Sequence, residues 1–387
     1  MAFRFKPAEP IGQGFHRIAA EQVERALTVL ASGEDRGKAV HEARKTLKRL
    51  RALLRLVRPA IGETVYQAEN ARLRDAGRLL SDARDQAVML ETIAAVSAEA
   101  ASHELAALKA LQKITAAAAF SAHGDAAGTA GRAIELIARA GEAIATCDIS
   151  EPGFGAVGPG LRRSFAKGRT AMARARREPS DEAIHEWRKT VQVHWRHMRL
   201  LGEAWPEYTG LRAELARDLS QVLGDDHDLA VLAARAQAAA GHGLSARQAG
   251  IIVQLARSRQ DALRLQAERL GGLLFADTAR DLARRMARYW RIAERRSLAD
   301  AATKVGRDTH GAPARGASQG TGEGRRVLPR SDVRSDGSAP ARQLAQRVRS
   351  EARKSGEATR PVATRKTAVS GKTRSVRPKS GRAGDRL

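Results

Sequence analysis

The sequence has little of several features that mark common classes of protein. Its single cysteine, Cys147, excludes an intrachain disulfide and fits a reducing cytosol. Aromatic residues make up only 4%, which argues against a protein that stacks nucleic-acid bases on aromatic rings. No apolar run approaches membrane-spanning length, and the N-terminus lacks the apolar core of a signal peptide. These absences predict a soluble cytoplasmic protein.

Acidic residues are also scarce relative to basic ones. The chain has 43 Asp and Glu against 68 Lys and Arg, a net charge of +25 over 387 residues. Such a balance favours a polyanionic partner, which leaves nucleic acid, an anionic membrane surface and polyphosphate open. Residues 301–387 alone hold 21 Lys and Arg against 7 Asp and Glu, so the rest of the chain is basic without them.

The pattern of apolar residues predicts an all-α fold. From about residue 15 to 290 the sequence is rich in Ala, Leu, Arg and Glu with helical spacing, and no alternating run indicates a strand. Glycine and proline gather in DISEPGFGAVGPG, which must interrupt a helix. Beyond residue 300 large apolar residues are rare, which predicts disorder. The expected organisation is a flexible leader (1–14), a first helical half (15–147), a Gly/Pro linker (148–160), a second helical half (161–299) and a disordered basic tail (300–387).

Two sequence segments recur in the same order in the two halves. HEARKT at 41–46 returns as HEWRKT at 185–190, and RDAGRLLSDARDQAV at 74–88 returns as RDLSQVLGDDHDLAV at 217–231. The two offsets differ by a single residue. This agreement indicates an internal duplication and predicts two helical bundles of similar design.

The repeated helices carry cations on one side. Residues advance by about 100° around a helix, which places the basic residues of 44–55 within about 80° of His41. The opposite side is an apolar stripe that includes Leu47, Leu50 and Leu54. Like charges at this spacing weaken a helix by about 0.2–0.5 kcal/mol per pair, which suggests that a ligand supplies the counter-charge. The alternative for either helix alone is a solvated charged face, and recurrence of the pattern weakens it.

These residues resemble the conserved histidine α-helical domain, or CHAD, over roughly residues 15–292. The likeness rests on VHEARKTLKRLRALLRL and IHEWRKTVQVHWRHMRLL, on LLSDARDQAV and VLGDDHDLAV, on GLRRSFAKGRTAMARAR, and on FADTARDLARRMARYW. It implies two pseudo-symmetric antiparallel four-helix bundles that bind inorganic polyphosphate on a basic surface and associate with polyphosphate granules. The E-x-E-x-K motif of the CYTH domain, which many members also carry, is missing, so the resemblance is to a stand-alone domain without catalytic activity.

The resemblance also implies which side chains contact polyphosphate. Arginine suits this role because its planar fork donates two hydrogen bonds to phosphate oxygens. Gln192, Val193 and His227 depart from the first copy, which puts the strength of the second half-site in doubt. The expected binding residues are His41, Arg44, Lys45, Lys48, Arg51, Arg55, Arg74, Arg84, Arg162, Arg163, Lys167, Arg169, His185, Arg188, Lys189, Arg196, Arg199, Arg217 and His227.

Two alternative functions remain open at this stage. Charge alone permits a nonspecific nucleic-acid-binding protein, with the basic tail either adding affinity for polyanions or serving only as a solubilising extension. A metal-dependent phosphohydrolase built on His227 and Asp228 is a second rival. Residues 225–228 are consecutive and fan around a helix, which is poor spacing for metal ligands, so no metal or other cofactor is expected.

Histidines among cations should be neutral near pH 7 and gain protons when phosphate binds.

Overall fold

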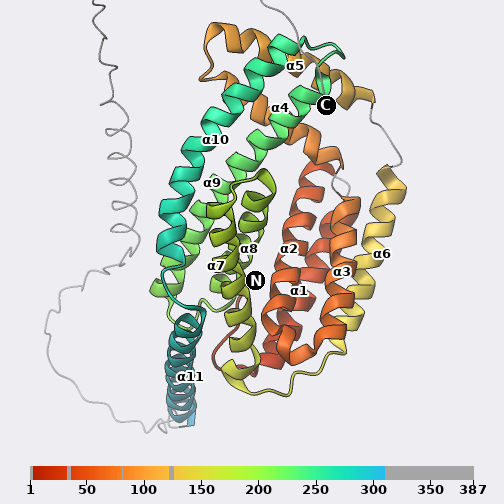
Figure 1. The fold of residues 1–387 in the computed structure, drawn as a ribbon. Coiled ribbons are helices and arrows are strands. Elements are labelled where there is room, and N and C mark those ends of the chain that lie inside the picture. Colours follow the sequence, from red (N-terminus) through yellow and green to blue (C-terminus); the bar gives the residue numbers. More distant parts are fainter. Residues whose placement is uncertain (1–2, 33–35, 81, 122–125, 310–387) are drawn as a thin grey trace, which may run out of the picture. The chain divides into compact units, whose positions relative to one another are not determined.

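A computed structural model describes residues 3–32, 36–80, 82–121 and 126–309, and this part of the chain is almost entirely helical (Figure 1). The all-α prediction is confirmed, since the described residues contain one isolated bridge, between Ala240 and Leu244, and no strand. The helices are α1 (Ile11–Ala31), α2 (Arg36–Ile61), α3 (Glu63–Leu79), α4 (Asp82–Ser97), α5 (Ser102–Ser121), α6 (Ala126–Ala145), the short 3-10 helix η1 (Gly153–Ala156), α7 (Gly158–Arg177), α8 (Asp181–Leu200), α9 (Pro206–Ala239), α10 (Ala246–Leu274) and α11 (Ala279–Thr309).

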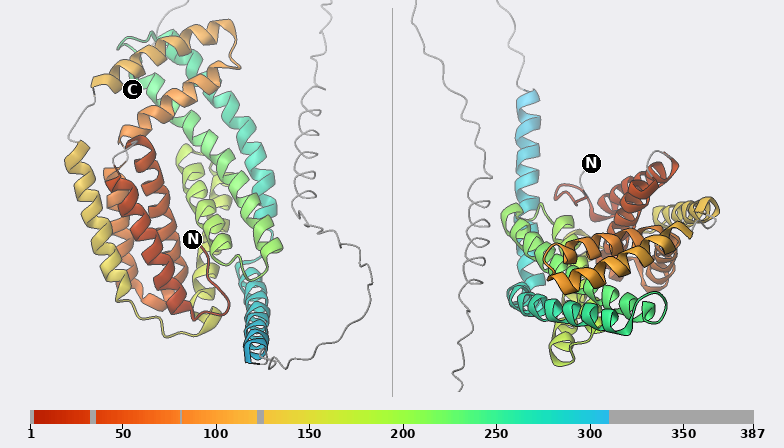
Figure 2. Two further views of the ribbon diagram at one scale, coloured as in Figure 1. Left: turned by 180° about the vertical axis from the view of Figure 1, so that it is seen from behind. Right: turned by 90° about the horizontal axis from the view of Figure 1, so that it is seen from above.

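Two closed groups of four helices account for much of the packing. In one, α1 and α3 each contact both α2 and α6. In the other, α4 and α5 contact each other and pack against α9 and α10. Between them, α7 contacts α2, α8 and α11, and α8 contacts α2 and α9 (Figures 1 and 2). The helices of the first half of the sequence are therefore divided between two packing groups.

The buried core divides in the same way. A large cluster joins side chains of α1, α2, α3 and α6 to those of α7, α8, α11, the first part of α9 and the last part of α10. A second cluster holds α4 and α5 against the later part of α9 and the first part of α10. Each core thus mixes residues from both sides of the segment 148–160. The pseudo-symmetric relation between two bundles stays a prediction.

The repeated sequence adopts different structures in its two copies. Residues 217–231 lie inside the single long helix α9. Their counterparts at 74–88 begin in α3 and end in α4, because α3 stops at Leu79 and α4 starts at Asp82. The motif helices α2 and α8, in contrast, are both continuous through their H-x-x-R-K segments.

The observed boundaries differ from the expected ones at both ends. Helix α1 begins at Ile11, and Phe5 before it is fully buried, with its backbone N–H donating to Leu200 O at 2.9 Å. Apolar Phe3 and Phe5 explain why residues 3–10 pack on the protein. At the other end α11 continues to Thr309, through the Ala-rich stretch after Leu298. The remainder of the predicted tail, 310–387, lies outside the described residues.

Candidate functional site

The two motif helices form for ordinary local reasons. In α2 the predicted apolar stripe is buried, with Leu47, Leu50 and Leu54 at most 2% exposed. Helix α8 starts at a capped N-terminus, where the Ser180 hydroxyl accepts from Ala183 N–H at 3.2 Å. Its apolar side includes Trp187, which is 1% exposed. Both stripes leave the basic sides of α2 and α8 facing away from the main core.

The basic side of α2 turns toward α8 near the end of the helix. Ala52 lies about 20° from His41 around α2 and is fully buried. Its carbonyl oxygen is 3.0 Å from Nε2 of His197 on α8. The basic side of α2 therefore meets α8 at His197, which is next to Arg196 in the sequence.

Arginines gather around this contact, and none of them forms an ion pair within the described residues. Arg196 is 9% exposed, and its guanidinium donates to Gln192 O at 2.7 Å on its own helix. Burial lowers the pKa of Arg196 to about 10, and the charges of Arg49, Arg55 and Arg199 act in the same direction. Keeping Arg196 charged therefore costs free energy, and no acidic neighbour offsets that cost.

A second flank of the same cluster lies between α2 and α3. Arg51 donates through Nε to the side-chain oxygen of Asn70 at 3.0 Å. Burial lowers the pKa of Arg51 to about 10, with further lowering by the charges of Arg55, Arg74 and Arg78. We define the crossing cluster by five arginines, none of which forms an ion pair within the described chain: Arg49, Arg51, Arg55, Arg196 and Arg199.

Several of the other expected cations have acidic neighbours on their own helix. These pairs are Lys45 with Glu42 at 3.0 Å, Arg74 with Asp75 at 2.9 Å, Arg217 with Asp218 at 3.7 Å, and Lys189 with Glu186. All four cations are exposed, so these pairs are weak and water-screened. They neutralise part of the predicted surface, while the crossing cluster keeps its charge.

His185, the histidine of the second motif copy, lies between α8 and α9. The rings of His185 and His227 are 4.2 Å apart between centroids. Burial lowers the pKa of His227 to about 4, helped by the charges of His185 and Arg188. The pKa of His185 is also lowered, by burial and then by Lys189 and Arg188. Both imidazoles are therefore neutral near pH 7, and we call this group the histidine corner.

Arg188 belongs to the same corner and lies against the backbone of α9. A Cβ atom at Gly224 would be 2.9 Å from its Nη2, so glycine makes the close approach possible. Neither Asp225 nor Asp228 forms an ion pair with Arg188, in the described part of the chain, and burial raises the pKa of each of these carboxyls. The three charged groups are neighbours without direct pairing.

The remaining predicted residues are spread more widely. His41 and Lys48 are exposed on α2, and Arg44 lies 3.5 Å from Leu80 O through Nη1. Arg84 is on α4, but its side chain lies outside the described residues. On α7, Arg162, Arg163 and Lys167 are exposed.

Arg169 has a structural task that its sequence position did not indicate. Its guanidinium donates to Phe275 O at 2.8 Å and to Asp277 O, in the turn between α10 and α11. These contacts tie the start of α11 to α7. The same contacts use N–H groups of Arg169 that the family resemblance had implied would bind polyphosphate.

A cavity of about 430 Å³ beside the crossing cluster is lined by four arginines, of which only Arg199 belongs to the expected binding residues. It lies between the N-terminal segment, α1, α2, α8 and the start of α9. Among its lining residues are Arg4, Arg25, Arg49 and Arg199. Arg49 stands about 80° from His41 on α2, so the helical pattern placed it at the edge of the basic face. Only the position of α8 turns it into a member of the cluster.

Two wider features bear on ligand chemistry. Among the described residues, no three His, Cys, Asp or Glu side chains are grouped to hold a metal ion. In the same part of the chain, no helix combines the length and apolar character needed to cross a bilayer.

The comparison with protein families agrees with the geometry. The profile of the CHAD domain matches residues 17–237, which is more than half of the chain and includes both motif helices. A comparison with curated proteins found no match. CHAD domains are associated in general with the binding of polyphosphate. Because the match spans α2, α8 and most of α9, the chain belongs to the CHAD-domain family.

Proposed function

We propose that this protein binds inorganic polyphosphate at the crossing cluster and along the basic sides of α2 and α8, without catalysing a reaction. The observation that carries the proposal is the meeting of arginines from both halves of the chain. Arg51 and Arg196 keep their charges although burial lowers the pKa of each to about 10. A bound polyanion would supply the counter-charge that neighbouring side chains do not.

A linear chain of phosphates fits this arrangement better than a single anion. The cations extend from His41 to Arg55 on α2, which corresponds to about 21 Å along a helix. A ligand that contacts many of them releases many condensed counterions, so affinity should depend steeply on salt. By family resemblance we further propose a cytoplasmic location at polyphosphate granules.

Polyphosphate titrations at several salt concentrations test the proposal. The Arg44→Ala/Arg188→Ala variant is expected to bind more weakly, with a logarithmic salt slope shallower by about 1–2 than that of wild type. The matched control is Arg139→Ala/Arg247→Ala, which removes the same charge from exposed positions on α6 and α10. Equal losses in the two variants would mean that only net charge matters.

Competition with duplex DNA separates the proposal from its main rival. If DNA displaces polyphosphate at comparable phosphate concentration and salt, the protein is a nonspecific binder of polyanions. The proposed lack of catalysis is checked by incubating the protein with polyphosphate and divalent metal. Phosphate release that His227→Ala abolishes would instead favour a phosphohydrolase.

The histidine corner predicts a pH dependence of binding. The lowered pKa values of His185 and His227 leave both rings neutral at pH 7 in the free protein. A nearby phosphate raises these pKa values, so binding takes up protons and the affinity increases as pH falls. We expect affinity to rise about threefold or more between pH 8 and pH 6, with most of the increase lost in His185→Asn/His227→Asn. Binding curves that superimpose across this range would remove the histidines from the site.

A further inference from the structure

A row of arginines on α11 has no role in the site described above. Arg280, Arg284, Arg288, Arg291 and Arg295 lie within about 80° of one another around the helix. The row extends from Arg280 to Arg295, or about 22 Å along the helix axis. All five side chains are exposed. We call this set the α11 row, and it lies beyond residues 17–237, which match the CHAD domain.

The acidic residues beside the row are engaged elsewhere. Asp281 accepts from the Thr278 hydroxyl at 2.5 Å, and Glu294 accepts from the indole N–H of Trp290 at 2.8 Å. No arginine of the row forms an ion pair with a described residue. A solvated helix face normally mixes charges of both signs, so five uncompensated cations in register indicate an anionic ligand.

The first part of α11 is fixed to the body of the protein. Leu282, Met286 and Trp290 are fully buried. Asp277, just before the helix, pairs with Arg212 at 3.3 Å and with Arg285 at 3.0 Å. These contacts hold the row in one position and lower the entropy cost of binding.

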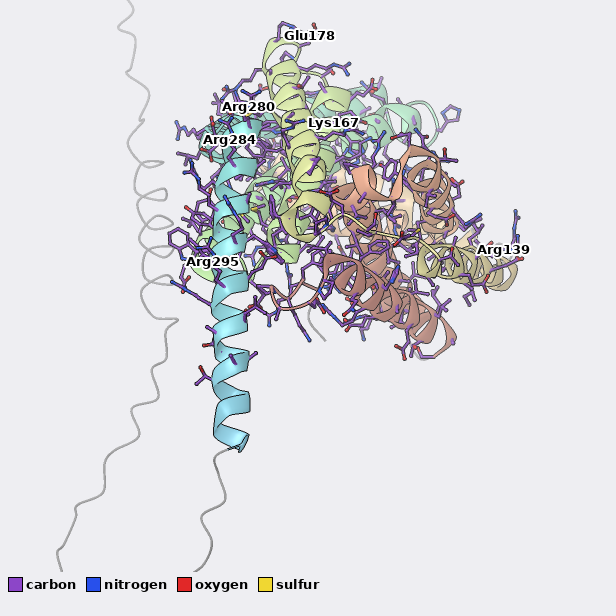
Figure 3. The ribbon with its side chains drawn as sticks, turned by 90° about the horizontal axis from the view of Figure 1, so that it is seen from below. Arg139, Lys167, Glu178, Arg280, Arg284 and Arg295 are labelled. Atoms are coloured by element: carbon purple, nitrogen blue, oxygen red, sulfur yellow. The ribbon has the colours of Figure 1, made fainter. Side chains whose placement is uncertain are left out.

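A cavity lies between the start of the α11 row, the first turns of α7 and the C-terminal end of α2. Its volume is about 490 Å³, and its lining includes Pro59, Arg162, Arg163 and Arg280. Pro59 lies four residues after Arg55 and in line with His41 around α2, so the cavity begins where the basic side of α2 ends. Figure 3 shows Lys167 of α7 beside the part of α11 that carries Arg280 and Arg284, with Arg295 farther along that helix.

We propose that the α11 row is a second contact surface for polyphosphate, reached by a chain that leaves the crossing cluster through this cavity. The inference rests on the proposed function. A long chain contacts both surfaces at once, and its second contact benefits from a high effective concentration. A short chain occupies one surface only. The α11 row therefore makes affinity depend on the length of the phosphate chain.

The test compares tripolyphosphate with long-chain polyphosphate, using the full chain. The Arg280→Gln/Arg284→Gln/Arg288→Gln variant should lose about tenfold in affinity for long chains, with a salt slope shallower by about 2. Its affinity for tripolyphosphate should stay within about twofold of wild type. Since the three side chains are exposed, its thermal unfolding should be unchanged.

The control Arg132→Gln/Arg139→Gln/Arg247→Gln removes equal charge from α6 and the start of α10; Figure 3 shows Arg139 on α6, apart from α7 and α11. Long-chain affinity that is equal in the two triple variants overturns the inference. So does a loss that is the same for short and long chains. In both cases, binding of polyphosphate by the wild-type protein still supports the proposed function. If wild type binds neither ligand, the proposed function and the inference fail together.

Discussion

The Arg196→Met variant is expected to be more stable than wild type and to bind polyphosphate more weakly. Arg196 is 9% exposed, and burial with neighbouring positive charges lowers its pKa to about 10. This shift corresponds to a penalty of about 3 kcal/mol for holding the charged form in the folded state. Methionine keeps much of the volume and removes the charge, so the free energy of unfolding should rise by about 1–3 kcal/mol. Thermal or urea unfolding at pH 7 measures it.

Affinity should change in the opposite direction. Removing Arg55, Arg196 and Arg199 together, as glutamine or methionine, deletes three cations from one contact. At about 1 kcal/mol for each cation near an anionic surface, the loss is about a hundredfold at low salt. Stability gained at the expense of binding marks residues that are retained for a ligand rather than for folding.

A matched control for Arg196 is an arginine of equal burial with a different environment. Arg212 is also 9% exposed, but it pairs with Asp277 at 3.3 Å and donates to Leu274 O at 2.9 Å. Arg212→Met should destabilise the protein by about 2–4 kcal/mol, because the Leu274 carbonyl loses its donor and Asp277 keeps only Arg285 as an ion-pair partner. If both variants are destabilised alike, the charge of Arg196 is compensated and the crossing cluster is not an anion site.

Replacing Gly160 with alanine is expected to cause a large loss of stability. A Cβ atom there would stand 1.8 Å from Leu56 O and 3.0 Å from Arg55 O. Both oxygens belong to the backbone of α2, so no side chain can rotate away, and α7 must separate from α2. The expected cost is about 3 kcal/mol or more, measurable by denaturant unfolding.

Gly250→Ala gives the contrasting result at another helical glycine. Nothing lies within 4 Å of a Cβ atom at Gly250 on α10. Alanine there should raise the free energy of unfolding by about 0.5–1 kcal/mol, since it favours the helix.

Wild-type stability in Gly160→Ala would mean that α2 and α7 are less closely packed than described. The packing matters for function because Arg55 of the crossing cluster lies at this contact.

Much of the fold follows from periodicity, and less of the site does. The apolar stripe of α2 is predicted by spacing alone, and its members such as Leu47 and Val57 are buried. The basic side of each motif helix is likewise visible in the sequence. Four members of the crossing cluster were expected to bind the ligand, but their grouping with Arg49 was not, because it depends on where α8 passes over Ala52. Arg49 enters it for that reason.

Two other features do not follow from the repeated motif. Arg169 looks like one more cation on α7, and only the turn at Phe275 and Asp277 shows that it binds backbone carbonyls. The α11 row is not among the expected binding residues, because α11 has no counterpart in the repeated motif. Helical spacing alone places Arg280, Arg284 and Arg288 on one side.

The division of the cores has a consequence for how the chain holds together. Helices α4 and α5 come from the first half of the sequence, yet their apolar sides are covered by α9 and α10 from the second. Helix α7 of the second half in turn lies against α2 of the first. A cut between α6 and α7 would leave each fragment with bare apolar surface that belongs under helices of the other. Each half of the sequence therefore covers apolar surface of the other, so neither half is expected to fold as a separate domain.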